Sequence, residues 1–322
     1  MPLIRESSYR PPFFLKNAHL QTVLPNAVRR VAGVHYTRKR LTTPDNDFLD
    51  LDWSYIGASK VAVVLHGLEG HSRRPYIRGM VRACNRAGWD AVAVNFRGCS
   101  GEPNLLPRFY HNGSSDDLSL VLDHIASLPY QSIRCIGFSL GGNVLLKYLG
   151  ESGHVYPEAL TAAVAISVPC HLASCADNLA SKENAFYMKR FLRMLHEKIL
   201  AKKARFPEHC NDDDFDRIHT FREFDDRYTA PLHGFSDAED YWEKASSLQF
   251  LRGITLPTLM VNSLDDPFLT PHCFPYDMAE GHGALTFEVT RYGGHCGFID
   301  FHGDGSWWHE RRAVAFLSDV IR

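Results

Sequence analysis

Gly137-Phe138-Ser139-Leu140-Gly141-Gly142 follows an apolar, β-prone stretch (132–136) and precedes a helical pattern that ends at Gly150. A strand, a tight turn and a helix form the context that a G-x-S-x-G nucleophile elbow requires. At such a turn the backbone of the serine is strained, and glycines two residues before and after it remove side chains that would collide there. The sequence therefore predicts that Ser139 lifts its hydroxyl clear of a sheet, with the Leu140 N–H at the positive end of the following helix.

The pattern around this turn predicts an α/β fold. Apolar runs at 61–65, 91–94, 162–167, 258–262 and 285–289 alternate with helical patterns such as 76–87, 118–128 and 307–321. Apolar strands that alternate with helices are typical of a parallel sheet covered on both faces. Before them, 35–41 and 48–53 alternate around a Thr-Pro-Asp-Asn-Asp turn, which indicates an antiparallel hairpin. We therefore expect a mostly parallel central sheet with an N-terminal antiparallel hairpin and helices on both faces.

Two segments depart from this pattern. Residues 1–34 mix aromatic residues and prolines, and we expect an extended N-terminal arm on the surface. Residues 171–250 contain helical stretches (178–203) and an acidic run (211–214) but no short apolar strand. No stretch typical of a linker flanks them, so we interpret residues 171–250 as a helical, lid-like insertion at the carboxyl edge of the sheet. The prediction is one domain over residues 1–322.

A serine becomes a nucleophile at neutral pH when an imidazole takes its proton and a carboxylate orients that imidazole. In this kind of fold the acid follows the serine in sequence and the histidine comes last. Asp265 and Asp266 follow the predicted strand 258–262, and either could serve. The turn geometry and Pro267 favour Asp266, and the alternative interpretation of Asp265 is hydrogen bonding within the turn.

The base is expected in the loop after strand 285–289, where His295 lies between glycines. The chain has 17 histidines, so other candidates for the base exist. His302 and His309 lie beside the last predicted helix and are expected to be surface or packing residues. Three further candidates precede the acid and break the expected order: His111, His171 and His233.

Acyl transfer also needs donors for the oxyanion of the tetrahedral intermediate, and removal of one typically costs ~10²–10³ in rate. The N–H of Leu140 is one predicted donor. The loop 65–70 follows an early strand, and we predict Leu68 N–H as the second, with Gly67 and Gly70 keeping the backbone open. His66 is expected to hold this loop.

Other polar residues near the expected site are interpreted as structural. Arg97, in the turn after strand 91–94, is expected to hold neighbouring loops rather than to contact substrate. The eight cysteines lie scattered without a C-x-x-C pair, which is typical of reduced thiols that pack as small apolar residues. Cys99 and Cys296 are the two that border the expected site.

Composition bounds the remaining possibilities. The 322 residues include 45% hydrophobic and 22% charged residues, and the formal net charge is −2, so nothing in the charge balance favours nucleic acid or an anionic membrane. No apolar run reaches the ~20 residues that span a bilayer, and the N-terminus lacks the apolar core of a secretory signal. We therefore expect a cytoplasmic protein. No H-x-x-x-H or H-E-x-x-H occurs, and no metal or organic cofactor is expected.

The motifs together resemble the α/β-hydrolase superfamily, and in particular its YheT-like branch, which includes bacterial hydrolases, α/β-hydrolase-domain phospholipases of eukaryotes and yeast ethyl-ester synthases. The resemblance covers nearly the whole chain and rests on residues 17–22, 66–70, 95–101, 107–111, 137–143, 265–268 and 293–298. It implies a serine esterase with the triad Ser139, Asp266 and His295.

Three functions are weighed on this basis. The first is hydrolysis of carboxylic esters with short- to medium-chain acyl groups through an acyl-enzyme intermediate. The second is acyl transfer to an alcohol by the same triad. The third is a non-catalytic binding protein, which would have lost at least one catalytic residue. The expected partner is a small-molecule acyl ester.

Overall fold

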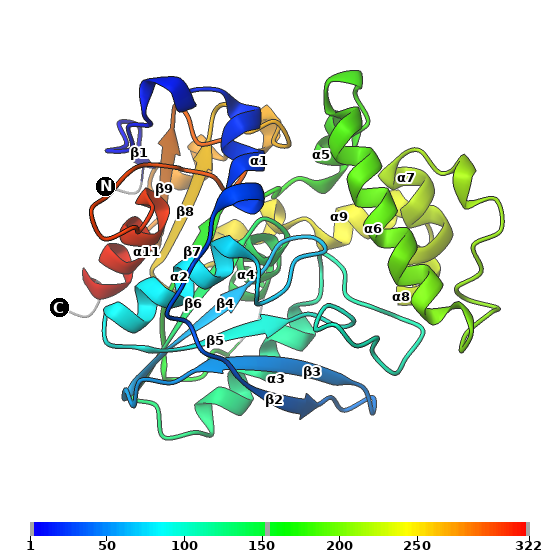
Figure 1. Cartoon of the computed structure of the whole chain (residues 1–322), viewed down its shortest axis with the longest axis horizontal. Coiled ribbons are helices and arrows are strands. Elements are labelled where there is room, and N and C mark those ends of the chain that lie inside the picture. Colours follow the sequence, from blue (N-terminus) through cyan, green and yellow to red (C-terminus); the bar gives the residue numbers. More distant parts are fainter. Residues whose placement is uncertain (1–2, 152–154, 320–322) are drawn as a thin grey trace.

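The computed structural model describes residues 3–151 and 155–319; the first two residues of the predicted arm, and residues 320–321 of the last predicted helix, lie outside them. Within the described part, nine strands form one sheet in the order β1-β9-β8-β7-β6-β4-β5-β3-β2 (Figure 1). The strands are β1 (Leu3–Ile4), β2 (Thr37–Thr42), β3 (Phe48–Ser54), β4 (Lys60–Leu65), β5 (Asp90–Asn95), β6 (Ser132–Phe138), β7 (Leu160–Ile166), β8 (Thr258–Ser263) and β9 (Leu285–Thr290).

The sheet is mixed in the way that the sequence predicts. Strands β2 and β3 pair antiparallel, from Thr37 opposite Trp53 to Thr42 opposite Phe48, and β3 pairs antiparallel with β5. The pairs from β5 through β4, β6, β7, β8 and β9 to β1 are all parallel. The predicted α/β fold with an N-terminal antiparallel hairpin is confirmed.

Helices cover both faces of the sheet because successive residues of a strand point to opposite sides. In β4, Val61, Val63 and Leu65 pack with helices α3 (Ser115–Ala126) and α4 (Leu140–Gly150). The intervening Ala62 and Val64 pack on the other face with α2 (Pro75–Arg86) and α11 (Trp308–Asp319). The continuous apolar run 61–65 therefore reflects a strand that is buried on both sides.

The prediction of an extended N-terminal arm is wrong in its central part. Residues 18–28 form helix α1 (Ala18–Val28), which the Asn17 side chain caps by accepting from Leu20 N–H at 3.0 Å. A short 3₁₀ turn, η1 (Phe13–Leu15), precedes it. Pro25 lies inside α1, where proline normally argues against a helix, and this concealed α1 in the sequence. The buried Gln21 side chain fixes the helix by donating to Tyr9 Oη and accepting from Ile299 N–H.

The segment 171–250 is helical, as expected, and contains no strand. Figure 1 shows it in green and yellow as a group of helices beside the sheet. The helical stretches predicted over 178–203 belong to two helices, since α5 ends at Leu179 and α6 begins at Ala185 after a short 3₁₀ turn. The α-helices of the segment 171–250 are α5 (Leu172–Leu179), α6 (Ala185–Lys203), α7 (Phe221–Phe224), α8 (Ala230–His233) and α9 (Ala238–Ala245). Helix α10 (Tyr276–Ala279) lies outside this segment and follows β8.

The longest helix is α6, with 19 residues. Of the helices that the structure describes, none combines the length and the apolar character needed to cross a membrane.

Candidate active site

Ser139 occupies a strained turn between β6 and α4, with φ 51° and ψ −118°. A positive φ is uncommon for a residue with a side chain. A Cβ on Gly137 would collide with the carbonyl oxygen of Gly141, and a Cβ on Gly141 would meet His66 O at 2.6 Å. The two glycines thus let the turn pass close to its own backbone and to the end of β4, rather than clearing the serine side chain as the sequence suggested.

The three residues predicted as a triad lie together. His295 Nε2 is 2.8 Å from Ser139 Oγ, and His295 Nδ1 is 2.8 Å from Asp266 Oδ2. A carboxylate only accepts hydrogen bonds, so Nδ1 carries the proton and Nε2 is left to accept from the serine hydroxyl. Asp266 and His295 follow the carboxyl ends of β8 and β9, the positions that the strand order requires.

Asp266, and not Asp265, contacts the imidazole. Asp266 is buried, and its second oxygen, Oδ1, accepts from Phe268 N–H at 2.9 Å. Asp265 Oδ1 instead accepts from Gly294 N–H at 2.9 Å. The neighbouring carboxylate therefore orders the loop that carries His295 but does not reach its ring.

Electrostatics in this cluster favour a protonated imidazole. Burial opposes the charged ring, but the Asp266 carboxylate and the neighbouring Cys296 together outweigh it and raise the pKa of His295 to about 10. Burial also raises the pKa of Asp266, although His295 acts in the opposite direction. The centroid of the Phe268 ring lies 4.3 Å from that of the imidazole, and this ring helps to exclude water. A ring whose charged form is stabilised in this way is a strong proton acceptor while it is neutral.

Helix α1 supports the histidine loop, a contribution that sequence reasoning missed. His295 N–H donates to Thr22 Oγ1 at 2.9 Å, and Ser263 Oγ donates to Gly294 O at 2.8 Å. A Cβ on Gly294 or Gly297 would collide with the backbone of α1. Asn17, a residue with a strong preference for helix N-caps, was the signal that could have revealed α1.

Two backbone amides near Ser139 are available to a ligand. The Leu140 N–H opens helix α4, and the Leu68 N–H belongs to the loop after β4. Among the residues that the structure describes, neither amide has a hydrogen-bond acceptor. A Cβ on Gly67 would lie 3.1 Å from Ser139 Cβ, so this loop passes directly over the elbow. These are the two donors that the sequence predicts for an oxyanion.

Two tyrosines that sequence reasoning missed hold the loop 67–70. Gly67 N–H donates to Tyr76 Oη at 3.0 Å, and Glu69 N–H donates to Tyr110 Oη at 2.6 Å. His66 fixes the start of the loop, as expected, because its Nδ1 lies 2.7 Å from Gly67 O. The amide of Leu68 thus lies between two amides that are already satisfied.

Two pockets meet at the serine. The first spans about 830 Å³ of space that is partly open to solvent, and it is lined mainly by apolar and aromatic side chains, among them Leu179, Phe191, Leu195, Phe224 and Trp242. The second spans about 850 Å³, also partly open to solvent, between α1, the loop 67–74 and α6. Leu68, Ser139, Phe191, Phe268 and His295 line both pockets.

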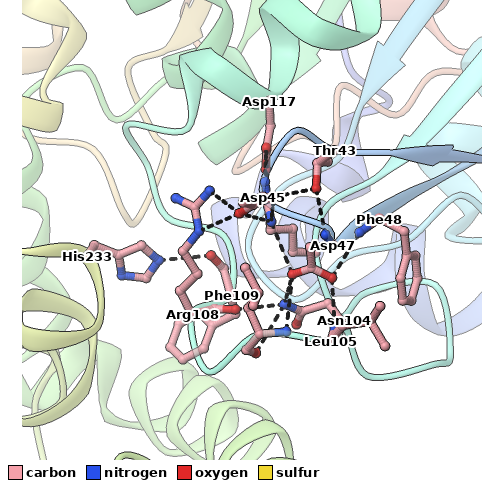
Figure 2. Close-up of polar contacts among 12 residues, drawn as sticks. Thr43, Asp45, Asp47, Phe48, Asn104, Leu105, Arg108, Phe109, Asp117 and His233 are labelled. Atoms are coloured by element: carbon pink, nitrogen blue, oxygen red, sulfur yellow. Dashed lines mark hydrogen bonds and ion pairs between the residues drawn. The ribbon is translucent and has the colours of Figure 1, made fainter.

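Arg97 has the structural surroundings expected of a scaffold. Its guanidinium is buried and contacts Asp117 Oδ1 at 2.7 Å, Asp45 Oδ2 at 2.9 Å and Asp47 Oδ2 at 3.1 Å. Figure 2 shows Asp45 beside Arg108 and Asp47 beside Asn104, so the network joins the hairpin turn to the loop 104–108.

Of the remaining residues singled out in the sequence, the two histidines beside the last helix lie apart from the reacting groups, whereas His111 lines the first pocket. His309 is buried against Phe138, and His302 is exposed and contacts Asp304. Cys99 is buried, which raises the pKa of its thiol to about 12, whereas Cys296 lines the second pocket.

Comparison with known proteins agrees with this geometry. A family model described as the alpha/beta hydrolase fold matches residues 61–301. YheT of Escherichia coli (strain K12), which bears the name of an esterase, is 37% identical over 290 residues, 88% of this chain and 84% of that protein. Phospholipase ABHD3 of Homo sapiens is 31% identical over 310 residues, covering 93% and 75%. The Pyrococcus furiosus esterase Pf2001 superposes with a TM-score of 0.60 at 18% identity, covering 90% of this chain and 96% of that one. The chain therefore belongs to the α/β-hydrolase family, in its YheT-like branch.

Proposed function

We propose that the protein is a serine hydrolase that cleaves carboxylic esters through an acyl-enzyme intermediate. The observation that carries the proposal is the continuous line of hydrogen bonds from Ser139 Oγ through His295 to Asp266, at the point where two pockets meet. The positive φ of Ser139 supports it further, because such strain persists where the surrounding structure holds a reactive group in place.

The steps follow from the positions of these groups. His295 Nε2 takes the hydroxyl proton as Ser139 Oγ bonds to the ester carbon, and the carbonyl oxygen becomes an oxyanion. The amides of Leu68 and Leu140 donate to that oxyanion. The C–O bond to the alcohol then breaks, and the alcohol leaves with the proton from His295. Water, deprotonated by His295, attacks the acyl-serine and releases the acid and free Ser139.

The first pocket suits the acyl chain, since its lining is mainly apolar and it opens directly on Ser139. Its volume is compatible with short- to medium-chain acyl groups. The names of the relatives point the same way: an esterase, the phospholipase ABHD3 and the monoacylglycerol lipase ABHD2, which is 26% identical over 356 residues, all of this chain and 82% of that protein.

The proposal is tested by active-site labelling. A fluorophosphonate probe should label the wild-type protein and Ser132→Ala, whose substitution lies at the other end of β6. The probe should not label Ser139→Ala. Equal labelling of that variant would contradict the assignment of Ser139 as the nucleophile.

A panel of p-nitrophenyl esters of increasing chain length should then be cleaved by the wild type and not by Ser139→Ala. Glycerol is then added to the reaction. If the acyl group is recovered as a glycerol ester instead of as the free acid, the activity is acyl transfer.

A further inference from the structure

We propose that the second pocket binds an anionic group, a phosphate or a carboxylate, on the alcohol side of the ester, and that Arg74 and Arg190 are its binding residues. This inference rests on the proposed function and adds the chemical class of the leaving alcohol.

The charges of the two pockets differ. No lysine or arginine lines the first pocket among the described residues, and its aromatic walls suit an apolar chain. Arg74 and Arg190 line the second pocket, and no aspartate or glutamate in the described part of the chain does so. Since both pockets reach Ser139, an acyl chain in the first places the alcohol in the second.

Arg74 is fixed beside the loop that carries the Leu68 amide. Its Nη2 donates to Glu69 O at 3.0 Å and lies 4.0 Å from Met194 Sδ on α6. It forms no ion pair with any described carboxylate. A guanidinium has five N–H donors, so Arg74 has donors to spare on the pocket side.

Arg190 faces the same pocket from helix α6, and its guanidinium has no hydrogen-bond or ion-pair partner within the described residues. Although the Arg190 side chain is exposed, partial desolvation lowers its pKa, and the nearby Arg74 and Arg193 lower it further. Two like charges thus share one pocket without a carboxylate between them. An anion placed there removes this repulsion and gains charge-assisted hydrogen bonds, which guanidinium forms bidentately with phosphate and carboxylate.

Several arginines elsewhere in the chain lack this availability. Arg29 contacts Glu310 at 2.6 Å, Arg38 contacts Asp52 at 2.7 Å and Arg40 contacts Asp50 at 2.8 Å. Arg193, one turn along α6 from Arg190, lies 3.9 Å from Glu197 and outside the pocket lining. Arg193 therefore offers a control with the same charge on the same helix.

The experiment compares butyrate esters that share one acyl group and differ in the alcohol. The alcohols are glycerol 3-phosphate and 3-hydroxypropionate (anionic), glycerol (neutral) and choline (cationic). The readout is the ratio of kcat/KM for each charged ester to that for the neutral one. We expect the wild type to favour at least one anionic ester about tenfold at low salt, and the preference to fall in 0.5 M NaCl because salt screens exposed charges. The phosphate and carboxylate arms show which anion fits.

The variants assign the preference to its residues. Arg190→Gln should lower the anionic-to-neutral ratio about tenfold, mainly through KM, and Arg190→Lys should retain part of it. Arg74→Lys provides a second test, because this variant keeps a positive charge beside the loop but loses the guanidinium group. Arg193→Gln, which removes a nearby charge outside the pocket lining, should change the ratio far less than Arg190→Gln does.

Three results would overturn the inference: a wild-type ratio near one, a preference for the choline ester, or a ratio that survives in Arg190→Gln. Failure to cleave any of these esters while p-nitrophenyl butyrate is cleaved would overturn it as well. If instead p-nitrophenyl esters are not cleaved and Ser139 is not labelled, the proposed function itself fails.

Discussion

The Tyr110 hydroxyl holds Glu69 at two points, accepting from its backbone N–H at 2.6 Å and donating to Oε1 at 2.8 Å. Glu69 adopts a φ of 50°, a conformation that is uncommon outside glycine. Lys198 of helix α6 places its ammonium 3.4 Å from Glu69 Oε1 and donates to Gly98 O at 2.9 Å. The loop that carries the Leu68 amide is therefore held by residues far away in sequence, one of them in the segment 171–250.

Tyr110→Phe should consequently lower esterase kcat about tenfold with a smaller change in KM. Loss of the hydroxyl frees the Glu69 backbone and misaligns the Leu68 amide, which on our proposal acts on the oxyanion of the transition state. The control is Tyr130→Phe, which likewise removes a hydrogen-bonded hydroxyl, here with a single bond to Asp90 at 2.8 Å, but far from Ser139. A kcat that falls equally in both variants would contradict a specific role for Tyr110.

The pKa of His295 determines how esterase activity should depend on pH. Protonated His295 cannot accept the serine proton, so activity rises as the ring loses its proton. Because Asp266 and Cys296 together outweigh burial and raise the pKa of His295, the acid limb of kcat/KM should lie above the ordinary imidazole value of about 6.5. This is checked by steady-state kinetics between pH 5 and 10.

Asp266→Asn should move that limb to lower pH and reduce kcat by ~10³–10⁴, since the amide neither stabilises the imidazolium nor selects the productive tautomer. The control is Asp265→Asn, which loses the negative charge but keeps an oxygen that can accept from Gly294 N–H, and it should cost about tenfold or less. If Asp265→Asn shifts the limb and Asp266→Asn does not, the proposed acid is wrong.

Much of the sheet and of the site could be predicted because both depend on local patterns. Continuous apolar runs mark strands buried on both faces, and the order of serine, acid and histidine follows from parallel strands that end at one edge. The choice of Asp266 over Asp265 depended on turn geometry, and its contact with His295 agrees with that choice.

The parts that sequence reasoning missed depend on contacts between distant segments. Helix α1 contains Pro25, and its stability comes from packing and from Gln21, whose partners lie at residues 9, 15 and 299. Tyr76 and Tyr110 resemble ordinary core tyrosines until the loop 67–70 is placed against them. Arg74 and Arg190 lie 116 positions apart in the sequence, and no local pattern predicts that they share a pocket.

Asp225 should make stability depend on pH. This carboxyl lines the first pocket, is buried and accepts from Thr229 Oγ1 and Trp242 Nε1; burial raises its pKa to about 7. Between about pH 4 and 7 the folded protein holds a proton that the unfolded chain has released, so folding stability falls as pH rises through this window.

Asp225→Asn removes that dependence, since the amide is neutral and the Thr229 hydroxyl can turn to accept from it. The Tm of the variant relative to the wild type should therefore be higher at pH 8 than at pH 5. Asp226→Asn, at the exposed neighbouring residue, is the control. A relative Tm for Asp225→Asn that does not change with pH would contradict the prediction.

The Arg97 network should contribute more to stability than exposed ion pairs do. Arg97→Met leaves the buried Asp47 and Asp117 without their cation, and breaking a buried pair in this way typically costs about 3–5 kcal/mol. Arg5, exposed beside the exposed Glu280, provides the comparison: Arg5→Met should cost about 1 kcal/mol or less. Urea unfolding of both variants measures the difference, and equal losses would show that burial of Arg97 adds nothing.

Because the backbone is strained at the elbow, we expect Ser139 to lower the folding stability of the protein. With φ at 51° and ψ at −118°, the residue occupies a region that glycine tolerates far better than any L-residue with a Cβ. Ser139→Ala removes the hydroxyl and keeps the strain, whereas Ser139→Gly removes both. Relief of about 1–3 kcal/mol of strain, set against a conformational entropy cost of about 0.5–1 kcal/mol for glycine, leaves Ser139→Gly the more stable of the two inactive variants. Urea unfolding should show this order, because both variants lose the same hydrogen bond to His295. The reverse order would mean that the turn relaxes without strain, and the backbone argument for Ser139 as the nucleophile would lose its support.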